Sequence, residues 1–544
     1  MKRTGSFLLL LLLAGSVVFA QEKSIKNVII LIPDGTSLSA VSAARWYQRY
    51  NNPEKIHLNL DPYICGTILT YSSNAPIGDS APTTSCYMTG YPSRAGYVAT
   101  YPPADPENDI VPNDPGRAFQ PLMTVMEAAR ITQSKATGLV FTCEFPHATP
   151  ADCMSHSYNR GKYEWIAPQM AHNNIDVVIG GGVSLLNDES KNYLLNQGYG
   201  VFFNDVKNFR NFAGNKMWAL FRDKDMSYDI DRDTVAEPSL AEMTAKAIEK
   251  LSTNPNGFVL MVEGSKIDWA AHANDVTAII TDMLAFDKAC GVAFDFAEAN
   301  GETLVVVVPD HGNSGLSIGS SKCPNYGGMT KNELFGQVSQ FKTSVDGLIN
   351  RLHNTDASQL KKVVYDLTGI SLTDDEYKQL LQCSDYNRSS LSNDERMKGS
   401  KLTKVVAKIL DNHTCFGFTT GGHTGEEVFL AVLDPTDNRL TGNHTNIDLN
   451  HYLRRSLGLQ SDLEALTDEY FAKHTEVFAG QSYTVTTKND VPTLEVKNNN
   501  NVLEIQPNTN IVKFNGKEIL LNSVVVYVDK NNTFYLPKFL KGLI

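Results

Sequence analysis

The sequence has few cysteines, no excess of positive charge and few long apolar runs. Its 544 residues include 8 cysteines, and no two of them form a CxxC pair, so no thiolate metal site is predicted. Cysteines can form disulfides in an exported chain, but their spacing does not indicate which of them pair. With 48 basic and 60 acidic side chains the formal net charge is −12, which predicts no nucleic-acid-binding surface.

The longest apolar run stands at the N-terminus. Lys2 and Arg3 precede about 12 apolar residues, and Ala20 is a small residue suited to cleavage. The run is too short to span a bilayer. We therefore interpret residues 1–20 as a signal peptide and expect an exported protein, periplasmic or extracellular. We expect no membrane anchor, because no cysteine follows the cleavage position and the last residues, PKFLKGLI, form no long apolar tail.

Five short runs are apolar on both faces and end in polar residues or glycine. Such runs are typical of parallel strands buried between layers of helices. They are NVIILIPDG (27–35), TGLVFTCE (137–144), DVVIGGG (176–182), FVLMVEG (258–264) and TLVVVVPDH (303–311). Helical patterns lie between them, for example at 235–251 and 275–299. This alternation predicts an α/β fold with a doubly wound, mostly parallel sheet flanked by helices.

Two regions depart from this alternation. Residues 322–412 are polar and mostly helical in pattern, with helices expected near 331–353 and 374–383, and we interpret them as an insertion. Residues 484–544 form short alternating runs with Asn and Gly turns, which predicts a small β-rich appendage. The expected organisation is therefore an α/β domain over 21–483 that contains the insertion, followed by the appendage.

The segment IGDSAPTTSCYMTG, at 77–90, predicts a loop that turns into a helix near Ala81. Ser80 then lies at or next to the N-cap, where unpaired N–H groups and the helix dipole favour an anion such as phosphate. For this segment alone, an ordinary serine N-cap is the simpler interpretation, and the G-x-S-x-G spacing of a nucleophile elbow is absent. Any activation of the Ser80 hydroxyl must therefore come from elsewhere.

Acidic and histidine side chains stand at or just after the ends of the predicted strands. Because the carboxyl ends of parallel strands meet at one edge, we expect these side chains to converge. Asp268 and His272 are four residues apart, which places both on one face of a helix. Carboxylate and imidazole without thiolate suit zinc in a catalytic site that keeps an open position. This strand-end cluster consists of Asp34, Glu263, Asp268, His272, Asp310, His311 and His423.

Each of these short motifs, taken alone, is more simply interpreted as an exposed helix face or a turn. Only their common position at the ends of predicted strands indicates a metal-dependent hydrolase. Two divalent ions roughly 4 Å apart can hold a serine oxygen and a leaving oxygen at opposite ends of an in-line displacement. A metal would lower the pKa of the Ser80 hydroxyl without a histidine base. Arg160, at the end of HATPADCMSHSYNR, could hold the remaining phosphate oxygens with its planar fork.

The ordered motifs resemble the alkaline phosphatase family. DSAPTTSCYMTG is similar to its nucleophile segment, and LIPDG, HATPA…R, VEGSKIDWAAH, PDH and GGHTG fall in the family's order. The likeness covers about 26–320 and 415–458. It implies a secreted phosphomonoesterase for small phosphate monoesters, with a phosphoserine intermediate on Ser80 and Arg160 as the phosphate clamp. Many family members are homodimers, so the resemblance also implies a homodimer.

The resemblance further implies three metal sites. The ligands would be Asp268, His272 and His423 for one zinc, Asp34, Asp310 and His311 for a second, and Asp34, Thr149 and Glu263 for a magnesium ion. This chain departs from the family's pattern at two positions near the phosphate and magnesium sites. His147 stands where some members carry an acid, and Trp269 stands where the family often has a basic residue. The chain also has Asn313 where many members have a histidine. In those members the histidine supports a zinc ligand. In this chain we expect that support to come from another residue or to be missing.

Two other interpretations stay open. A phosphodiesterase or sulfatase could use the same scaffold, but Arg160, Thr149 and Glu263 leave little space for a second ester group, and DSAPT does not resemble a sulfatase modification motif. A non-catalytic exported protein could use zinc for folding or sequester phosphate. Structural zinc sites are usually closed by four protein ligands, whereas each expected zinc here has three besides Ser80. The catalytic interpretation is therefore preferred.

Overall fold

A computed structural model describes residues 24–323, 325–353, 355–383, 401–459 and 462–544. The run interpreted as a signal peptide lies outside the described residues. None of the helices in the described ranges has the length and hydropathy that a bilayer crossing requires.

The fold is organised by a ten-stranded sheet in the order β14-β2-β13-β8-β1-β7-β3-β4-β6-β5. The part from β8 to β5 is parallel, whereas β13 runs antiparallel to both β8 and β2. The strands are β14 (Gly442–Thr445), β2 (Ile64–Leu69), β13 (Val428–Leu433), β8 (Thr303–Val307), β1 (Asn27–Ile32), β7 (Phe258–Glu263), β3 (Ala136–Glu144), β4 (Val177–Gly181), β6 (Met217–Leu220) and β5 (Gly200–Phe203). All five predicted runs are strands of this sheet, and the doubly wound α/β prediction is confirmed.

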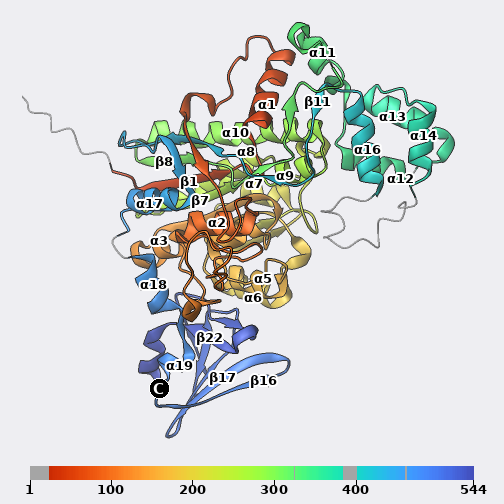
Figure 1. Cartoon of the computed structure of the whole chain (residues 1–544). Helices are drawn as coiled ribbons and strands as arrows, with labels where there is room; N and C mark the ends of the chain where they lie inside the picture. Colours follow the sequence, from red (N-terminus) through yellow and green to blue (C-terminus); the bar gives the residue numbers. More distant parts are fainter. Residues whose placement is uncertain (1–23, 324, 354, 384–400, 460–461) are drawn as a thin grey trace, which may run out of the picture.

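Helices cover both faces of the sheet (Figure 1). Along β1, Val28, Ile30 and Ile32 belong to one hydrophobic cluster, and Ile29 and Leu31 belong to the other, because successive strand side chains point to opposite faces. The second cluster includes side chains of α1 (Leu38–Asn51), α8 (Leu240–Leu251) and α10 (Val276–Asn300). The first includes side chains of α2 (Ser80–Thr89), α3 (Val125–Gln133), α4 (Ala148–Met154), α5 (Tyr163–His172), α6 (Asp188–Asn196) and α17 (Asn446–Ser456).

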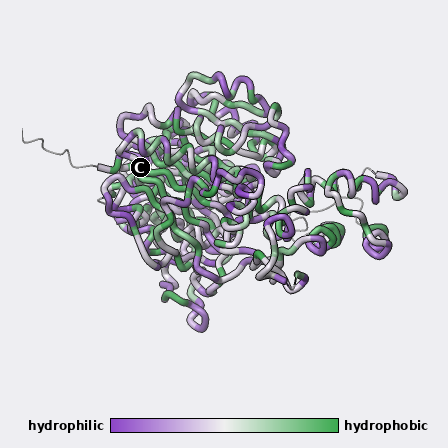
Figure 2. Tube along the Cα trace, turned by 90° about the horizontal axis from the view of Figure 1, so that it is seen from above, coloured by the Kyte–Doolittle hydropathy of each residue, from purple (hydrophilic) through white to green (hydrophobic). Residues whose placement is uncertain are grey.

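The described helices of the helical insertion, residues 322–412, are α11 (Lys331–Phe335), α12 (Val345–His353), α13 (Leu360–Thr368), α14 (Asp374–Leu381) and α16 (Lys401–Asn412). Those from α12 onwards extend from the main body as an arm, whereas α11 packs against α1 (Figure 1 and Figure 2). The prediction of one helix over 331–353 is wrong, because Gly336 ends α11 and a 3₁₀ turn follows before α12. α13 and α16 were not predicted. Four of these helices, from α12 onwards, enclose a hydrophobic cluster of their own.

A disulfide between Cys323 and Cys415, with Cα atoms 5.7 Å apart, joins the two ends of the helical insertion. Cys323 follows β10 (Ser317–Ile318) and Cys415 precedes β11 (Phe416–Gly417), and these two strands pair with each other. The disulfide closes a neck at the base of the insertion, and further contacts tie the first part of the insertion to the main body. Phe335 and Val338 are buried in the second hydrophobic cluster, and Val345 N donates to Asp275 Oδ2 at 2.6 Å.

The C-terminal unit, residues 472–544, consists of two antiparallel sheets below α5 and α6 in Figure 1. One contains β16 (Ser482–Lys488), β17 (Val491–Asn498), β18 (Asn501–Ile505), β19 (Ile511–Phe514) and β20 (Lys517–Leu520); the other contains β15 (Ala472–Lys473), β22 (Thr533–Leu536) and β21 (Val526–Val528). The β-rich prediction is confirmed, but the unit is not a detached appendage. Val526, Val528 and Tyr535 are buried in the hydrophobic cluster of the main sheet.

Candidate functional site

Ser80 begins a buried helix. It is the first residue of α2, directly after the N-cap residue Asp79, so the predicted turn from loop to helix is confirmed. The Asp79 side chain does not cap the helix. Its carboxylate accepts a hydrogen bond from Gly96 N at 2.9 Å and pairs with Arg160. The Ser80 hydroxyl therefore lies at the positive end of the α2 dipole.

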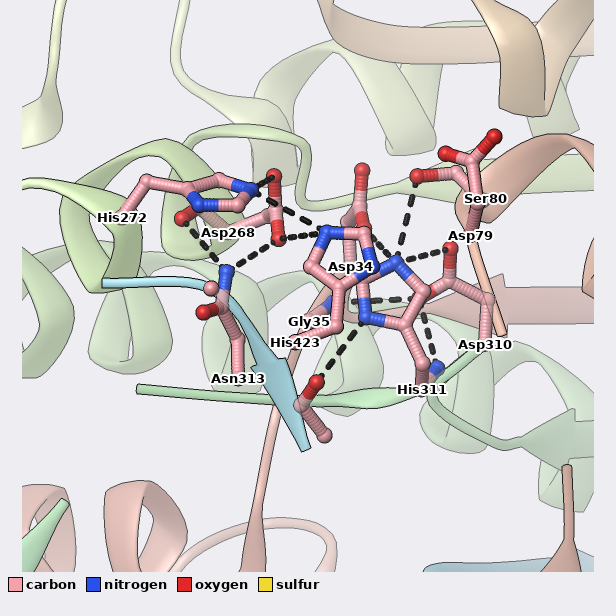
Figure 3. A network of polar contacts seen from close by, with 12 residues as sticks. Asp34, Gly35, Asp79, Ser80, Asp268, His272, Asp310, His311, Asn313 and His423 are labelled. Atoms are coloured by element: carbon pink, nitrogen blue, oxygen red, sulfur yellow. Dashed lines mark hydrogen bonds and ion pairs between the residues drawn. The ribbon is translucent and has the colours of Figure 1, made fainter. Parts of the chain in front are cut away.

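The structure brings the strand-end cluster together. Figure 3 shows Asp34, Asp268, His272, Asp310, His311 and His423 beside Ser80, and Glu263 lies in register with Ile32 at the end of the neighbouring strand. Asp34 follows β1, Asp310 and His311 follow β8, Glu263 ends β7, and Asp268 and His272 lie on α9 (Lys266–His272). His423 belongs to β12 (His423–Thr424), which pairs with β9 (Gly312–Asn313) across the helical insertion. That pairing stacks the rings of His423 and His311 with centroids 3.7 Å apart.

The first predicted zinc set is compact. His272 Nε2 lies 3.1 Å from His423 Nε2, and Asp268 carboxylate oxygens lie 3.4 Å and 3.7 Å from these two nitrogens. Each Nδ1–H donates to a backbone carbonyl at 2.8 Å, from His272 to Gly421 O and from His423 to Gly78 O. Burial, followed by the proximity of His311, lowers the pKa of His423 to about 4. Both Nε2 lone pairs therefore face a common point where a cation would fit.

The second predicted zinc set surrounds His311 Nε2. It lies 3.5 Å from Asp34 Oδ1 and 3.4 Å from Asp310 Oδ2, and the Ser80 hydroxyl donates to it at 3.2 Å. Asp310 Oδ1 accepts hydrogen bonds from Gly35 N and His311 N, both at 3.0 Å. Asp310 Oδ2 and both Asp34 oxygens are buried without a hydrogen-bond partner among the described residues. Burial, with Asp310 nearby, raises the pKa of Asp34 well above its ordinary value.

Unpaired buried carboxylates are costly unless a cation compensates them. Together with imidazole nitrogens, they form a donor set that suits a divalent metal. Gly35 permits the close packing of the two sets. Its φ is +59°, and a Cβ at that position would stand 2.3 Å from Asp268 Oδ1.

The third predicted site also contains unpartnered oxygens. Thr149 Oγ1, on α4, and Glu263 Oε1 are buried without a hydrogen-bond partner among the described residues. Burial raises the pKa of Glu263 to about 8. The structure adds Cys143, whose Sγ lies 3.4 Å from Glu263 Oε2, and ligand atoms of Cys143, His147 and Glu263 lie within 4.8 Å of one another. Sequence reasoning missed Cys143, because a cysteine in an apolar strand has the pattern of a core residue.

Arg160 is held at the edge of the site by two partners. Its Nη1 pairs with Asp79, and its Nη2 donates to His147 Nε2 at 2.9 Å. Burial and the Arg160 charge lower the pKa of His147 to about 3, so this ring is neutral and accepts at Nε2. The Trp269 ring stands edge-on to His147 with centroids 5.7 Å apart. Sequence reasoning missed Asp79, although it stands next to Ser80.

Asn313 holds Asp268, one of the predicted zinc ligands. Its Nδ2 donates to Asp268 Oδ1 at 2.6 Å and to the Asp268 backbone oxygen at 3.3 Å. The expectation that this support comes from elsewhere, or is missing, is therefore wrong. An amide donor at this position fixes the Asp268 carboxylate, so that its second oxygen faces His272.

A mostly parallel sheet that gathers carboxylates and imidazoles beside a buried serine has the donor set that a metal-assisted phosphoryl hydrolase requires. The chain belongs to the alkaline phosphatase family, whose model matches residues 25–459, and it is a phosphoric monoester hydrolase by class. The C-terminal unit lies beyond that match.

Similar proteins cover most of the chain. Alkaline phosphatase 3 of Bacillus subtilis is 32% identical over 464 residues, which cover 80% of this chain and 92% of that protein. The solved structure of a cold-active alkaline phosphatase from the psychrophile Shewanella sp. has a TM-score of 0.67 at 28% identity and covers 79% of this chain and 99% of that one. The alkaline phosphatase of Thermus thermophilus has a TM-score of 0.68 at 23% identity, with 84% and 97% covered, and shows the same fold.

Proposed function

We propose that the chain is an exported, zinc-dependent alkaline phosphatase that hydrolyses small phosphate monoesters through a phosphoserine on Ser80. One observation carries this proposal. The Ser80 hydroxyl lies 3.2 Å from His311 Nε2, at the positive end of α2 and against buried carboxylates that have no partner among the described residues.

The predicted ligand sets have the donors that zinc prefers. Asp268, His272 and His423 would hold one ion, and Asp34, Asp310 and His311 the other. When bound, such ions lower the pKa of a serine hydroxyl and neutralise charge on a leaving oxygen.

Asp34, Thr149 and Glu263 would hold a magnesium ion, because their free oxygens are hard donors.

The chain's own residues position the reaction. The Ser80 hydroxyl loses its proton to water and its Oγ attacks phosphorus. The P–O bond to the ester alcohol breaks, and the alcohol leaves after taking up a proton from water. The N–H groups at the start of α2 would face the phosphate oxygens. Arg160 offers its fork to the same oxygens, while Asp79 and His147 fix its direction. A second in-line attack by water on phosphoserine releases phosphate, and two inversions retain the configuration at phosphorus.

Replacing the nucleophile tests the proposal. Wild-type protein should release p-nitrophenol from p-nitrophenyl phosphate, and acid-quenched samples should contain a phosphopeptide that includes Ser80. Ser80→Ala should abolish both signals and leave the metal content unchanged. Ser85→Ala is the matched control on the same helix, because the Ser85 hydroxyl donates to Asp152 rather than facing the site. Full turnover by Ser80→Ala would end the proposal.

A phosphodiesterase is the alternative on this scaffold. Comparing mono- with bis-p-nitrophenyl phosphate distinguishes the two activities. We expect a strong preference for the monoester, because Arg160 and the predicted magnesium ligands Thr149 and Glu263 would leave little space for a second ester group.

Export and a homodimer are proposed from the sequence pattern and the family resemblance. Fractionation of expressing cells tests export, and light scattering of the purified chain tests the dimer.

A further inference from the structure

Arg160 lies on a connection without helix or strand. This arginine loop, residues 155–162, joins α4 to α5. On its inner flank, Val98 and Ser157 exchange backbone hydrogen bonds of 2.7 Å and 2.9 Å, and Arg160 N donates to Gly96 O at 2.7 Å. The main body therefore holds one side of the loop.

The outer flank of the arginine loop is held by the C-terminal unit. Tyr158 OH donates to Asp529 Oδ1 at 2.5 Å, and Lys162 Nζ donates to Asp529 Oδ2 at 3.0 Å. Asp529 thus bridges the residues two positions before and two positions after Arg160. The neighbouring Lys530 adds a cation–π contact, with Nζ 4.6 Å from the Tyr158 ring centroid.

The C-terminal unit is itself firmly attached, so Asp529 has a fixed position. Besides the shared hydrophobic cluster, its Asn508 accepts a hydrogen bond from Gln169 Nε2 at 3.0 Å, and Asn510 Oδ1 lies 3.1 Å from His172 Nδ1. Both partners lie on α5, directly after the arginine loop. The unit therefore restrains α5 and the loop together.

We propose that Asp529 is a positioning residue of the phosphate site: by holding Tyr158 and Lys162 it orients Arg160 toward phosphate oxygens. The inference rests on the proposed function, in which Arg160 binds phosphate. Asp529 has a side chain that is 45% exposed, and exposed ion pairs contribute little to global stability. What the bridge restricts is the conformation of the short segment that carries Arg160.

The consequence is specific to phosphate binding. Asp79 and His147 still hold the Arg160 guanidinium when Asp529 is removed, so the loss is partial. We expect the inhibition constant of inorganic phosphate and the KM for p-nitrophenyl phosphate to rise about 3- to 10-fold, the effect of losing one charge-assisted contact. Metal ligands are not on this loop, so metal content should stay the same.

The experiment uses the full, zinc-loaded chain with Asp529→Ala, Asp529→Asn and Tyr158→Phe. Asp529→Ala should give the full rise in both constants, and Asp529→Asn a smaller one, because its amide oxygen still accepts a hydrogen bond. Adding Tyr158→Phe to Asp529→Ala should change little more, since both act through one contact. The unfolding temperature and the bound zinc are measured for every variant.

Glu504→Gln is the matched control. Glu504 pairs with Lys488 within the C-terminal unit, at 2.5 Å, away from the arginine loop. It should leave phosphate inhibition unchanged, and an equal rise in this variant would overturn the proposal in favour of general loosening of the unit. Unchanged phosphate inhibition in Asp529→Ala would also overturn it while leaving the phosphatase activity established. An inactive wild-type enzyme would instead refute the proposed function itself.

Discussion

The helical insertion and the C-terminal unit are both additions to one α/β sheet, yet they are attached differently. The part of the insertion from α12 to α16 buries a hydrophobic cluster of its own beyond the neck at Cys323 and Cys415, while Phe335 and Val338, nearer the neck, belong to the main core. The C-terminal unit places Val526 and Tyr535 in the main cluster and contacts the arginine loop. A shared core couples two regions in unfolding, whereas a separate core behind a neck permits local unfolding. We therefore expect the C-terminal unit, but not the insertion, to report on the site.

Removing divalent cations should have the largest effect. Because the strand-end cluster lies on the main sheet, chelation should abolish turnover and lower the temperature of the main unfolding transition. The unfolding temperature of the helical insertion should not change. A ligand present at 1,000 times its Kd adds about 4.1 kcal/mol to stability. Calorimetry with and without chelator, followed by zinc and magnesium add-back, measures this. Equal shifts of both transitions would contradict the separation.

A pair of core truncations compares the two attachments. Tyr535→Ala, at a fully buried position of the shared cluster, should destabilise the whole chain by about 3–5 kcal/mol. Ile349→Ala, fully buried in the insertion, should cost about 2–5 kcal/mol and leave the main transition and the activity unchanged. Calorimetry and the half-life of activity on heating distinguish these outcomes. A global loss in Ile349→Ala would mean that the cluster of α12 to α16 unfolds together with the main core.

The disulfide at the neck should matter to the helical insertion alone. The double variant Cys323→Ser with Cys415→Ser should destabilise the insertion by about 2–4 kcal/mol, because the cross-link limits its unfolded state. Activity at moderate temperature should persist. Reduced wild-type protein is the control. A fall in zinc content would show that the neck also holds the strand that carries His423.

Asn313, which contacts the strand-end cluster, should influence metal affinity more than the helical insertion or the C-terminal unit does. Asn313→Ala removes the donor to Asp268 Oδ1, and losing such a contact to a ligand lowers metal affinity about 10- to 100-fold. Titration of zinc against a chromophoric chelator measures the affinity. Unchanged zinc binding would show that Asp268 needs no such support.

The smallest effect concerns pH and the helical insertion. Although burial opposes ionisation, hydrogen bonds from Thr373 and contact with His413 lower the pKa of Glu376. A lowered folded pKa gives stability above the unfolded value of about 4.3 and loses it as the pH falls further. The transition of the insertion should therefore weaken in acid, and Glu376→Gln should flatten that dependence. An identical pH profile in the variant would refute the contribution of this carboxylate.

Local pattern was enough to predict the sheet and the convergence of the strand-end cluster. Apolar runs such as 27–35 and 303–311 need no tertiary information to be identified as buried strands, and the rule for parallel sheets places Asp34 and Asp310 at one edge. The sequence pattern predicted the helices of the insertion less well, because Gly336 ends the first of two helices where one was expected over 331–353.

Contacts between distant segments were beyond sequence reasoning. The hydrogen bond from Asn313 to Asp268 depends on how β9 approaches α9, and the Asp529 bridge depends on where the C-terminal unit docks. Neither has a local signature, because an exposed acid after a strand and an amide after Asp-His are common in turns. Composition identified a β-rich end but not that its valines complete the main core.

The neck at the disulfide has a practical consequence for engineering. Its two Cα atoms are 5.7 Å apart, a gap that a short turn spans when consecutive Cα atoms are 3.8 Å apart. A foreign module whose own ends lie close together could thus replace the part from α12 to α16, whereas excising the whole intervening segment would also remove Phe335 and Val338 from the main core. Natural variation in length should be tolerated there for the same reason, since lengthening a surface connection costs little closure entropy.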